Sequence, residues 1–175
     1  MKEFLLFSIV SLALACGAVS KDLTDDESKA VKAEIDSMMA DFEKGNAKAL
    51  LDKTHDSIFE MVGGKEAFEK GMLEGVKQIM AAGIKFQESE LGDPTELHAA
   101  GEEELCFVPR VSVIVANGQK IKSTGFMIAI RPVDGKPWRF LDGAGLRRNP
   151  EMLWKLFPKL TREIELPPNT QELIQ

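Results

Sequence analysis

The chain has 175 residues and is acidic, with 28 aspartate and glutamate residues against 22 lysine and arginine residues and a net charge of −6. Its basic residues gather into no run longer than Arg147-Arg148, so it lacks the basic surface that nucleic acids require. The sequence therefore predicts no nucleic-acid partner.

The first 20 residues are typical of an export signal. Residues 4–15 form an apolar run that is too short to span a bilayer as a mature helix. Residues 18–20 suit cleavage before Lys21, whereas residues 12–17 (LALACG) resemble a bacterial lipobox in which Cys16 would be lipidated. We expect an exported protein, periplasmic or extracellular, with membrane contact only through a lipid on Cys16, and both processing routes stay open.

The rest of the chain is predicted to form one domain, because about 155 residues is a typical domain length. We place this domain at residues 21–165 and expect an extended tail at residues 166–175. After removal of the signal only Cys106 remains unmodified. We therefore expect no internal disulfide and interpret Cys106 as a buried apolar residue.

Helical signals fill the first half of the domain. Thr24-Asp25-Asp26-Glu27 is a capping box, and it precedes apolar residues at helical spacing that end before Gly45. A short helix is expected after Asn46, and a third helix from Lys65 to Ala82. The methionine-containing apolar stripes of these helices are interpreted as core.

Strand signals fill the second half. Residues 84–91, 96–100 and 138–142 are predicted strands, and residues 104–131 are a long hairpin across Asn117-Gly118, a pair that suits a type I′ turn. Pro109 predicts a bulge or an edge position, and residues 150–157 a short helix. Helices followed by a strand meander predict an α+β fold, with a curved antiparallel sheet covered by helices on one face.

This arrangement resembles the nuclear transport factor 2-like superfamily over residues 22–157. The resemblance rests on the order of helices and strands and on residues 55–68 (HDSIFEMVGGKEAF) and 135–142 (GKPWRFLD). It extends to SnoaL-like and ketosteroid isomerase-like domains and to uncharacterised exported bacterial members. The resemblance implies a cone-shaped domain with a pocket and sheet-mediated dimers, and it implies no particular reaction.

Asp142 is the first candidate site residue. By strand alternation it shares a face with Trp138 and Phe140. If that face lines the cone, Asp142 would be a carboxylate in apolar surroundings, with a raised pKa suited to acid or base catalysis. The alternative, which we favour, is that Asp142 caps the turn into Gly143.

His55 is the second candidate, expected near the mouth of the cone. It could act as an acid or base, but no carboxylate partner is evident in the sequence, which favours a role as a helix-end cation or cap. Trp138, Phe140, Asp142 and His55 together form the predicted ligand-binding set.

Several chemistries have no signal in the sequence. Ketosteroid isomerase uses a tyrosine with two aspartates, and this chain contains no tyrosine. Its two histidines, His55 and His98, are far apart and no cysteine pair supports them, so we predict no metal. Gly143-Ala144-Gly145 is interpreted as a turn, and no cofactor is expected.

Two functional classes remain. The preferred one is an exported, non-catalytic domain that binds a small apolar ligand or a protein partner through its cone pocket or sheet face. The alternative is a small-molecule isomerase or dehydratase that uses Asp142 or His55 as its general acid or base. An exposed apolar face at Val111, Val113 and Val115 would permit a homodimer through the sheet.

Overall fold

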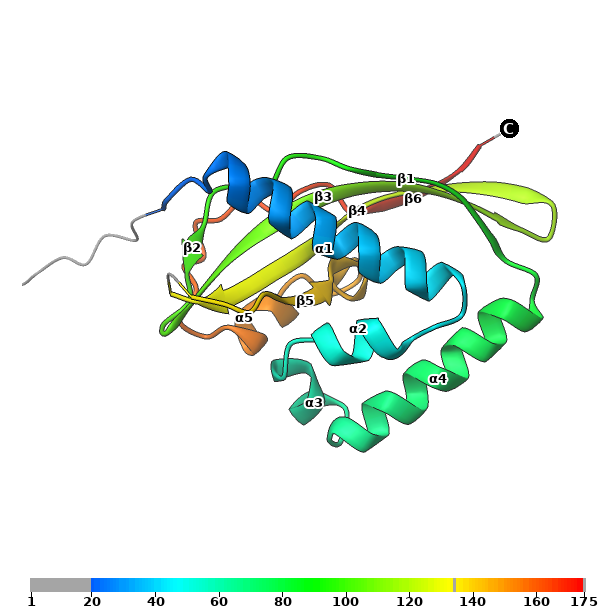
Figure 1. Cartoon of the computed structure of the whole chain (residues 1–175), viewed down its shortest axis with the longest axis horizontal. Helices are drawn as coiled ribbons and strands as arrows, with labels where there is room; N and C mark the ends of the chain where they lie inside the picture. The colour runs from blue at the N-terminus through cyan, green and yellow to red at the C-terminus, as the bar shows by residue number, and fades with distance from the viewer. Residues whose placement is uncertain (1–19, 134, 175) are drawn as a thin grey trace, which may run out of the picture.

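The computed structural model describes residues 20–133 and 135–174. Its helices are α1 (Asp25–Glu43), α2 (Lys48–Lys53), α3 (Ser57–Met61), α4 (Lys65–Ala81), the 3-10 helix η1 (Gly143–Leu146) and α5 (Met152–Leu156) (Figure 1). Its strands are β1 (Lys85–Leu91), β2 (His98–Ala99), β3 (Glu103–Ala116), β4 (Gln119–Pro132), β5 (Arg139–Asp142) and β6 (Thr170–Ile174). The predicted export signal, Cys16 included, lies outside the described residues, except for Ser20.

The strands form one curved antiparallel sheet, which confirms the α+β class. Its order is β1-β3-β4-β5, with β2 pairing with β3 and β6 pairing with β4. The β3–β4 hairpin keeps one register from the Glu103–Pro132 pair to the Ala116–Gln119 pair. Asn117 and Gly118 have φ angles of 52° and 76°, as a type I′ turn requires. Local turn chemistry therefore fixes the longest element of the sheet.

Pro109 lies neither at a bulge nor on an edge strand, because β3 is an interior strand of the sheet and its ladder with β1 ends just before Pro109. The register of β3 with β4 does not shift there. The Pro109 carbonyl accepts a hydrogen bond from Gly92 N (2.8 Å), so the proline nitrogen faces the link between β1 and β2, where the ladder is interrupted. The bulge of the sheet lies in β1, between Phe86 and Glu88.

Helix α1 covers the inner face of the sheet. It begins with the predicted capping box, in which the Thr24 side chain accepts from Glu27 N and the Glu27 side chain accepts from Thr24 N. Its buried stripe packs on inner-face residues of β3, β4 and β5, and this core contains Val31, Ile35, Met38, Met39, Cys106, Val108, Met127, Ala129 and Phe140. Cys106 is fully buried, as predicted.

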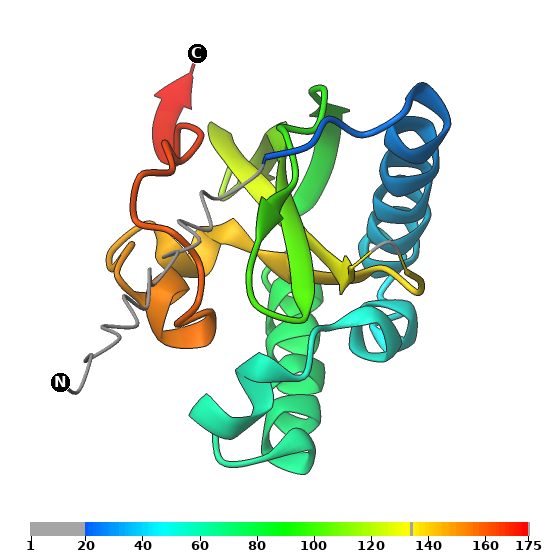
Figure 2. The same cartoon turned by 90° about the vertical axis from the view of Figure 1, so that its left-hand side faces the viewer.

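The outer face of the sheet is covered as well, so the expectation of helices on one face is wrong. Residues of η1, α5 and the segment after α5 pack on the outer face in a second core, which contains Leu105, Phe107, Phe126, Ile128, Ile130, Leu146, Leu153, Phe157 and Leu160. Figure 2 shows α1 on one side of the sheet and α5 on the other. Two covers are needed because β3 and β4 carry apolar residues at successive positions.

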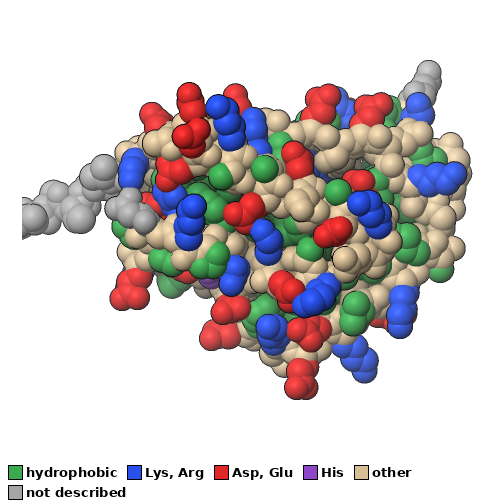
Figure 3. Space-filling model, viewed as in Figure 1, with side chains coloured by type: hydrophobic (Ala, Val, Ile, Leu, Met, Phe, Trp, Pro, Cys, Tyr) green, Lys and Arg blue, Asp and Glu red, His purple; other side chains and the backbone are tan. Residues whose placement is uncertain are grey.

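The expectation of an exposed apolar face on the hairpin is also wrong. Val113 is buried, with 8% of its surface exposed, and Val111 and Val115 are half-buried. On the face of the molecule in Figure 3, acidic and basic side chains are interspersed. Among the described helices, none combines the length and the apolarity needed to cross a membrane.

The predicted tail is extended, and it also adds a strand to the sheet. Strand β6 pairs with β4 from the Thr124–Thr170 pair to the Lys120–Ile174 pair. Just before β6, Asn169 Nδ2 donates to the Gly143 carbonyl (2.7 Å). The domain therefore continues beyond residue 165.

A buried arginine joins α1 to the sheet. Arg131 Nε donates to Glu104 Oε1 and Arg131 Nη1 to Glu27 Oε1, both at 2.6 Å. Its guanidinium lies 4.6 Å from the centre of the Trp138 ring. Hydrogen bonds from the Thr24 backbone and from Arg131 lower the pKa of Glu27 to about 2. The capping box is thus tied to β3 and β4.

Candidate functional site

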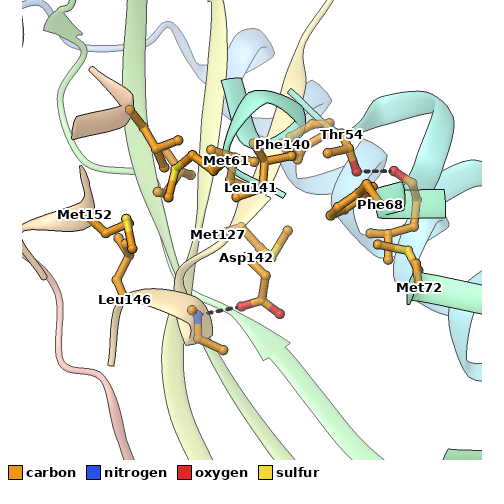
Figure 4. A pocket seen from close by; sticks show the side chains of 16 residues that line it. Thr54, Met61, Phe68, Met72, Met127, Phe140, Leu141, Asp142, Leu146 and Met152 are labelled. Carbon is orange, nitrogen blue, oxygen red and sulfur yellow. Dashed lines mark hydrogen bonds between the residues drawn. The ribbon is translucent and has the colours of Figure 1, made fainter. Parts of the chain in front are cut away.

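An apolar cavity of about 410 Å³ lies between the helices α2 to α4 and the edge strand β5 (Figure 4). The helices contribute Leu50, Thr54, Ile58, Met61, Phe68 and Met72. The sheet contributes Met127, Ile128, Phe140, Leu141 and Asp142, and η1 with α5 contributes Ala144, Gly145, Leu146, Met152 and Leu156. Four of these residues are methionines, which adapt readily to ligands of different shape.

The cavity forms because only part of the β5 edge is covered. The link between α2 and α3 pairs with β5 at Phe140, where His55 N donates to the Phe140 carbonyl (3.1 Å). Beyond that point the edge at Leu141 faces the cavity. The Thr54 hydroxyl donates to the Leu50 carbonyl (2.7 Å), so this polar group is already satisfied and the wall stays apolar.

Among residues 20–133 and 135–174, Asp142 is the only ionisable residue that lines the cavity. Its Oδ1 accepts from Ala144 N (2.8 Å) and caps η1, as the favoured interpretation predicts. Gly143 permits this tight turn, because a Cβ there would lie 2.6 Å from the Phe126 carbonyl oxygen. The expectation of a carboxylate enclosed by apolar groups is wrong, since Asp142 is exposed.

Trp138, just before β5, and Phe140, within it, both pack into the inner core, as alternation predicts. Each is 2% exposed. Phe140 lines the cavity, whereas Trp138 lies under Arg131 and does not reach it. Of the predicted ligand-binding set, Phe140 and Asp142 thus lie at the cavity.

His55 lies outside the cavity and has a carboxylate partner that the sequence did not reveal. Its Nε2 is 2.9 Å from Glu103 Oε1, and its Nδ1 is 2.8 Å from Ser57 Oγ. Because Nδ1 also accepts from Ser57 N (3.3 Å), the ring carries its proton on Nε2 and donates to Glu103. The ring therefore caps the start of α3, and it opens on a separate recess beyond Met61 and Leu156.

The other titratable candidates, His98 and Cys106, have shifted pKa values. Burial lowers the pKa of His98 and raises the pKa of the Cys106 thiol to about 12. Within residues 20–133 and 135–174, no group of three histidine, cysteine or carboxylate side chains is placed to hold a metal ion.

Sequence reasoning missed most of the cavity wall. Met72 was part of an apolar stripe interpreted as core, but it is half-buried at the cavity. Met61 was not singled out, and it is 44% exposed at the cavity. Leu146 and Met152 lie in elements too short to show a period. The methionines were the available signal, because unbranched thioethers are frequent on adaptable binding surfaces.

The fold and the site define an α+β domain with a curved six-stranded antiparallel sheet and an apolar cavity at its edge. Comparisons with protein-family models, curated proteins and solved structures found no match.

Proposed function

We propose that this protein is a non-catalytic binding domain that holds a small apolar ligand in the cavity beside β5. The observation that carries the proposal is a cavity of about 410 Å³ whose wall, as far as the described residues form it, contains one ionisable side chain, Asp142. Ligand sites typically have volumes of roughly 300–1,000 Å³, apolar walls and few polar groups. Met61, exposed at the cavity, gives a ligand a flexible side chain to displace on entry.

We also propose membership of the nuclear transport factor 2-like superfamily. The order of elements, the curved sheet and a cavity between helices and sheet support it. The outer face is packed against the segment after α5, which leaves less of the sheet available to another molecule. A homodimer through the sheet and a protein partner stay predictions.

Export stays a proposal that rests on residues 1–20. Mass spectrometry of the protein from its own host separates the two processing routes. A chain that begins at Lys21 indicates cleavage of an ordinary signal peptide, and a diacyl or triacyl group on Cys16 indicates a lipid-anchored protein. A mass that retains residues 1–20 without a lipid would refute both routes.

The alternative is an acid–base enzyme, and one observation favours it. Glu103, His55 and Ser57 form a hydrogen-bonded chain, in which a carboxylate orients a histidine beside a hydroxyl. We rank it second because His55 and Asp142 line different pockets. Covalent labelling of Ser57 by a fluorophosphonate, absent in Ser57→Ala, would favour the enzyme.

The binding proposal is tested with 1-aminoanthracene, a neutral fluorophore that brightens in apolar sites. Met72→Trp fills the cavity from α4, whereas Met80→Trp adds the same ring on the same helix at a residue that does not line the cavity. We expect Met72→Trp to weaken binding by roughly tenfold or more and Met80→Trp to change it by less than about twofold. No binding, or equal effects of the two variants, would refute the proposal.

A further inference from the structure

A small polar recess adjoins the apolar cavity. We call it the arginine recess, and its volume is about 30 Å³. Its walls include Arg110, Ser112, Ser123, Gly125 and Arg147. Asp142 and Ala144 line both the recess and the cavity. The recess and the cavity therefore lie next to each other.

Arg110 brings a guanidinium into the recess without a carboxylate partner. Its Nη1 lies 3.3 Å from Met39 Sδ and 3.9 Å from Met127 Sδ, and thioether sulfur is a weak acceptor. No carboxylate of the described residues comes within 4.0 Å of its nitrogens. Gly125 is its cross-strand neighbour on β4, so no β4 side chain lies directly opposite Arg110.

Arg147 supplies a second cation held by neutral groups. Its Nε donates to Asn169 Oδ1 (3.0 Å) and its Nη2 to Ser123 Oγ (3.2 Å). Because the Ser123 hydroxyl accepts from Arg147, its own proton remains available to an acceptor in the recess. Arg147 likewise has no carboxylate within 4.0 Å in the described part of the chain.

Ser112 supplies a further hydroxyl to the recess. The residue is 6% exposed and lines the recess. Its hydroxyl makes no hydrogen bond to the residues that the structure describes. No buried side-chain nitrogen or oxygen of the described residues lacks a partner, so the Ser112 oxygen is not sealed off, and its hydroxyl can donate to an acceptor in the recess.

The recess thus has an excess of donors and of positive charge. Against the two guanidinium groups stands one carboxylate, Asp142, whose Oδ1 is engaged by Ala144 N. A volume of about 30 Å³ has room for roughly two to three water-sized groups, which is the size of a carboxylate. Carboxylates also accept the parallel hydrogen bonds that a guanidinium donates.

We infer that the arginine recess binds the carboxylate of an aliphatic carboxylic acid whose hydrocarbon chain occupies the apolar cavity. This inference rests on the proposed function and names its ligand class.

The test is displacement of bound 1-aminoanthracene by three ligands with the same alkyl chain: decanoate, decanol and decyltrimethylammonium. We expect decanoate to bind tightest. Arg110→Met and Arg147→Gln should each lower the affinity for decanoate roughly ten- to a hundredfold, as expected for the loss of a charge-assisted hydrogen bond. The same substitutions should change the affinity for decanol by less than about twofold. Arg110→Lys, which keeps the charge, should restore part of the decanoate affinity.

Arg148→Gln is the matched control, because Arg148 is exposed and does not line the recess. Equal affinity for decanoate and decanol, unchanged by the arginine substitutions, would overturn the inference and leave the proposed function standing. Preference for decyltrimethylammonium would overturn it in favour of Asp142 as the recognition group. Failure of all three ligands to displace the fluorophore, or failure of the fluorophore to bind, would count against the cavity as a ligand site and so against both proposals.

Discussion

Replacing Arg131 by methionine should destabilise the protein strongly. The substitution keeps the aliphatic stem but removes the hydrogen bonds to Glu104 and Glu27, both 2.6 Å long, and the stacking on Trp138. The Arg131 side chain is 4% exposed, and breaking a buried ion pair costs about 3–5 kcal/mol. We therefore expect Arg131→Met to lower the free energy of unfolding at pH 7 by about 3–5 kcal/mol.

Arg162 offers a matched control. It donates to Glu151 (2.8 Å) and its guanidinium lies 5.3 Å from the Trp154 ring, but its side chain is 68% exposed. Because solvent screens exposed ion pairs, Arg162→Met should cost less than about 1 kcal/mol. Urea unfolding followed by far-ultraviolet circular dichroism measures both variants without relying on either tryptophan. Losses for Arg131→Met and Arg162→Met that agree within about 0.5 kcal/mol would refute this reasoning.

Three further predictions follow from titration, burial and hydrogen bonding. The pKa of Glu27 is about 2 in the folded state against 4.5 ordinarily, so its stabilisation is complete above pH 4.5 and is lost as the pH falls toward 2. Because the Glu27 side chain is 30% exposed, solvent screening reduces the expected loss in the free energy of unfolding to about 1–2 kcal/mol. Urea titrations across this pH range should show the loss, and Glu27→Gln should abolish this pH dependence. Cys106, fully buried with a pKa raised to about 12, should resist Ellman's reagent until the protein is unfolded, and rapid native labelling would contradict its burial. Asn169→Ala removes two side-chain hydrogen bonds and should cost about 1–2 kcal/mol in urea unfolding, whereas Asn149→Ala, at an exposed residue, should be neutral; equal losses would contradict the role of Asn169.

Elements defined by local chemistry could be predicted from the sequence. The capping box at Thr24 set the start of α1, and Asn117-Gly118 set the hairpin, because both signals act within a few residues. Strand β6 gave no such signal, since residues 170–174 (TQELI) are mostly polar and pair with an edge of β4 that only the folded sheet provides. The packing of η1, α5 and the following segment on the outer face was missed for a related reason. Strand alternation shows which residues share a face, and it does not show which segment packs on that face.

The site depended still more on tertiary structure. The turn chemistry of Asp142 was predicted correctly, but strand alternation gave its face and not its exposure. The contact of His55 with Glu103 spans 48 residues, and Arg110 and Arg147 line one recess only because β3 and the residue after η1 lie beside it. A single sequence contains no signal for such distant pairs.

The methionine side chains allow the most direct test of the binding proposal. Met61, Met72, Met127 and Met152 line the cavity, whereas Met38 lies in the inner core and Met80 on the exposed side of α4. In protein labelled with ¹³C at the methionine methyl groups, nuclear magnetic resonance spectra would be recorded during titration with decanol. If decanol binds in the cavity, the four cavity methyl groups should show saturable chemical-shift changes, and Met38 and Met80 should change little. Shifts confined to Met80, or no saturable shift at any methionine, would contradict the binding proposal.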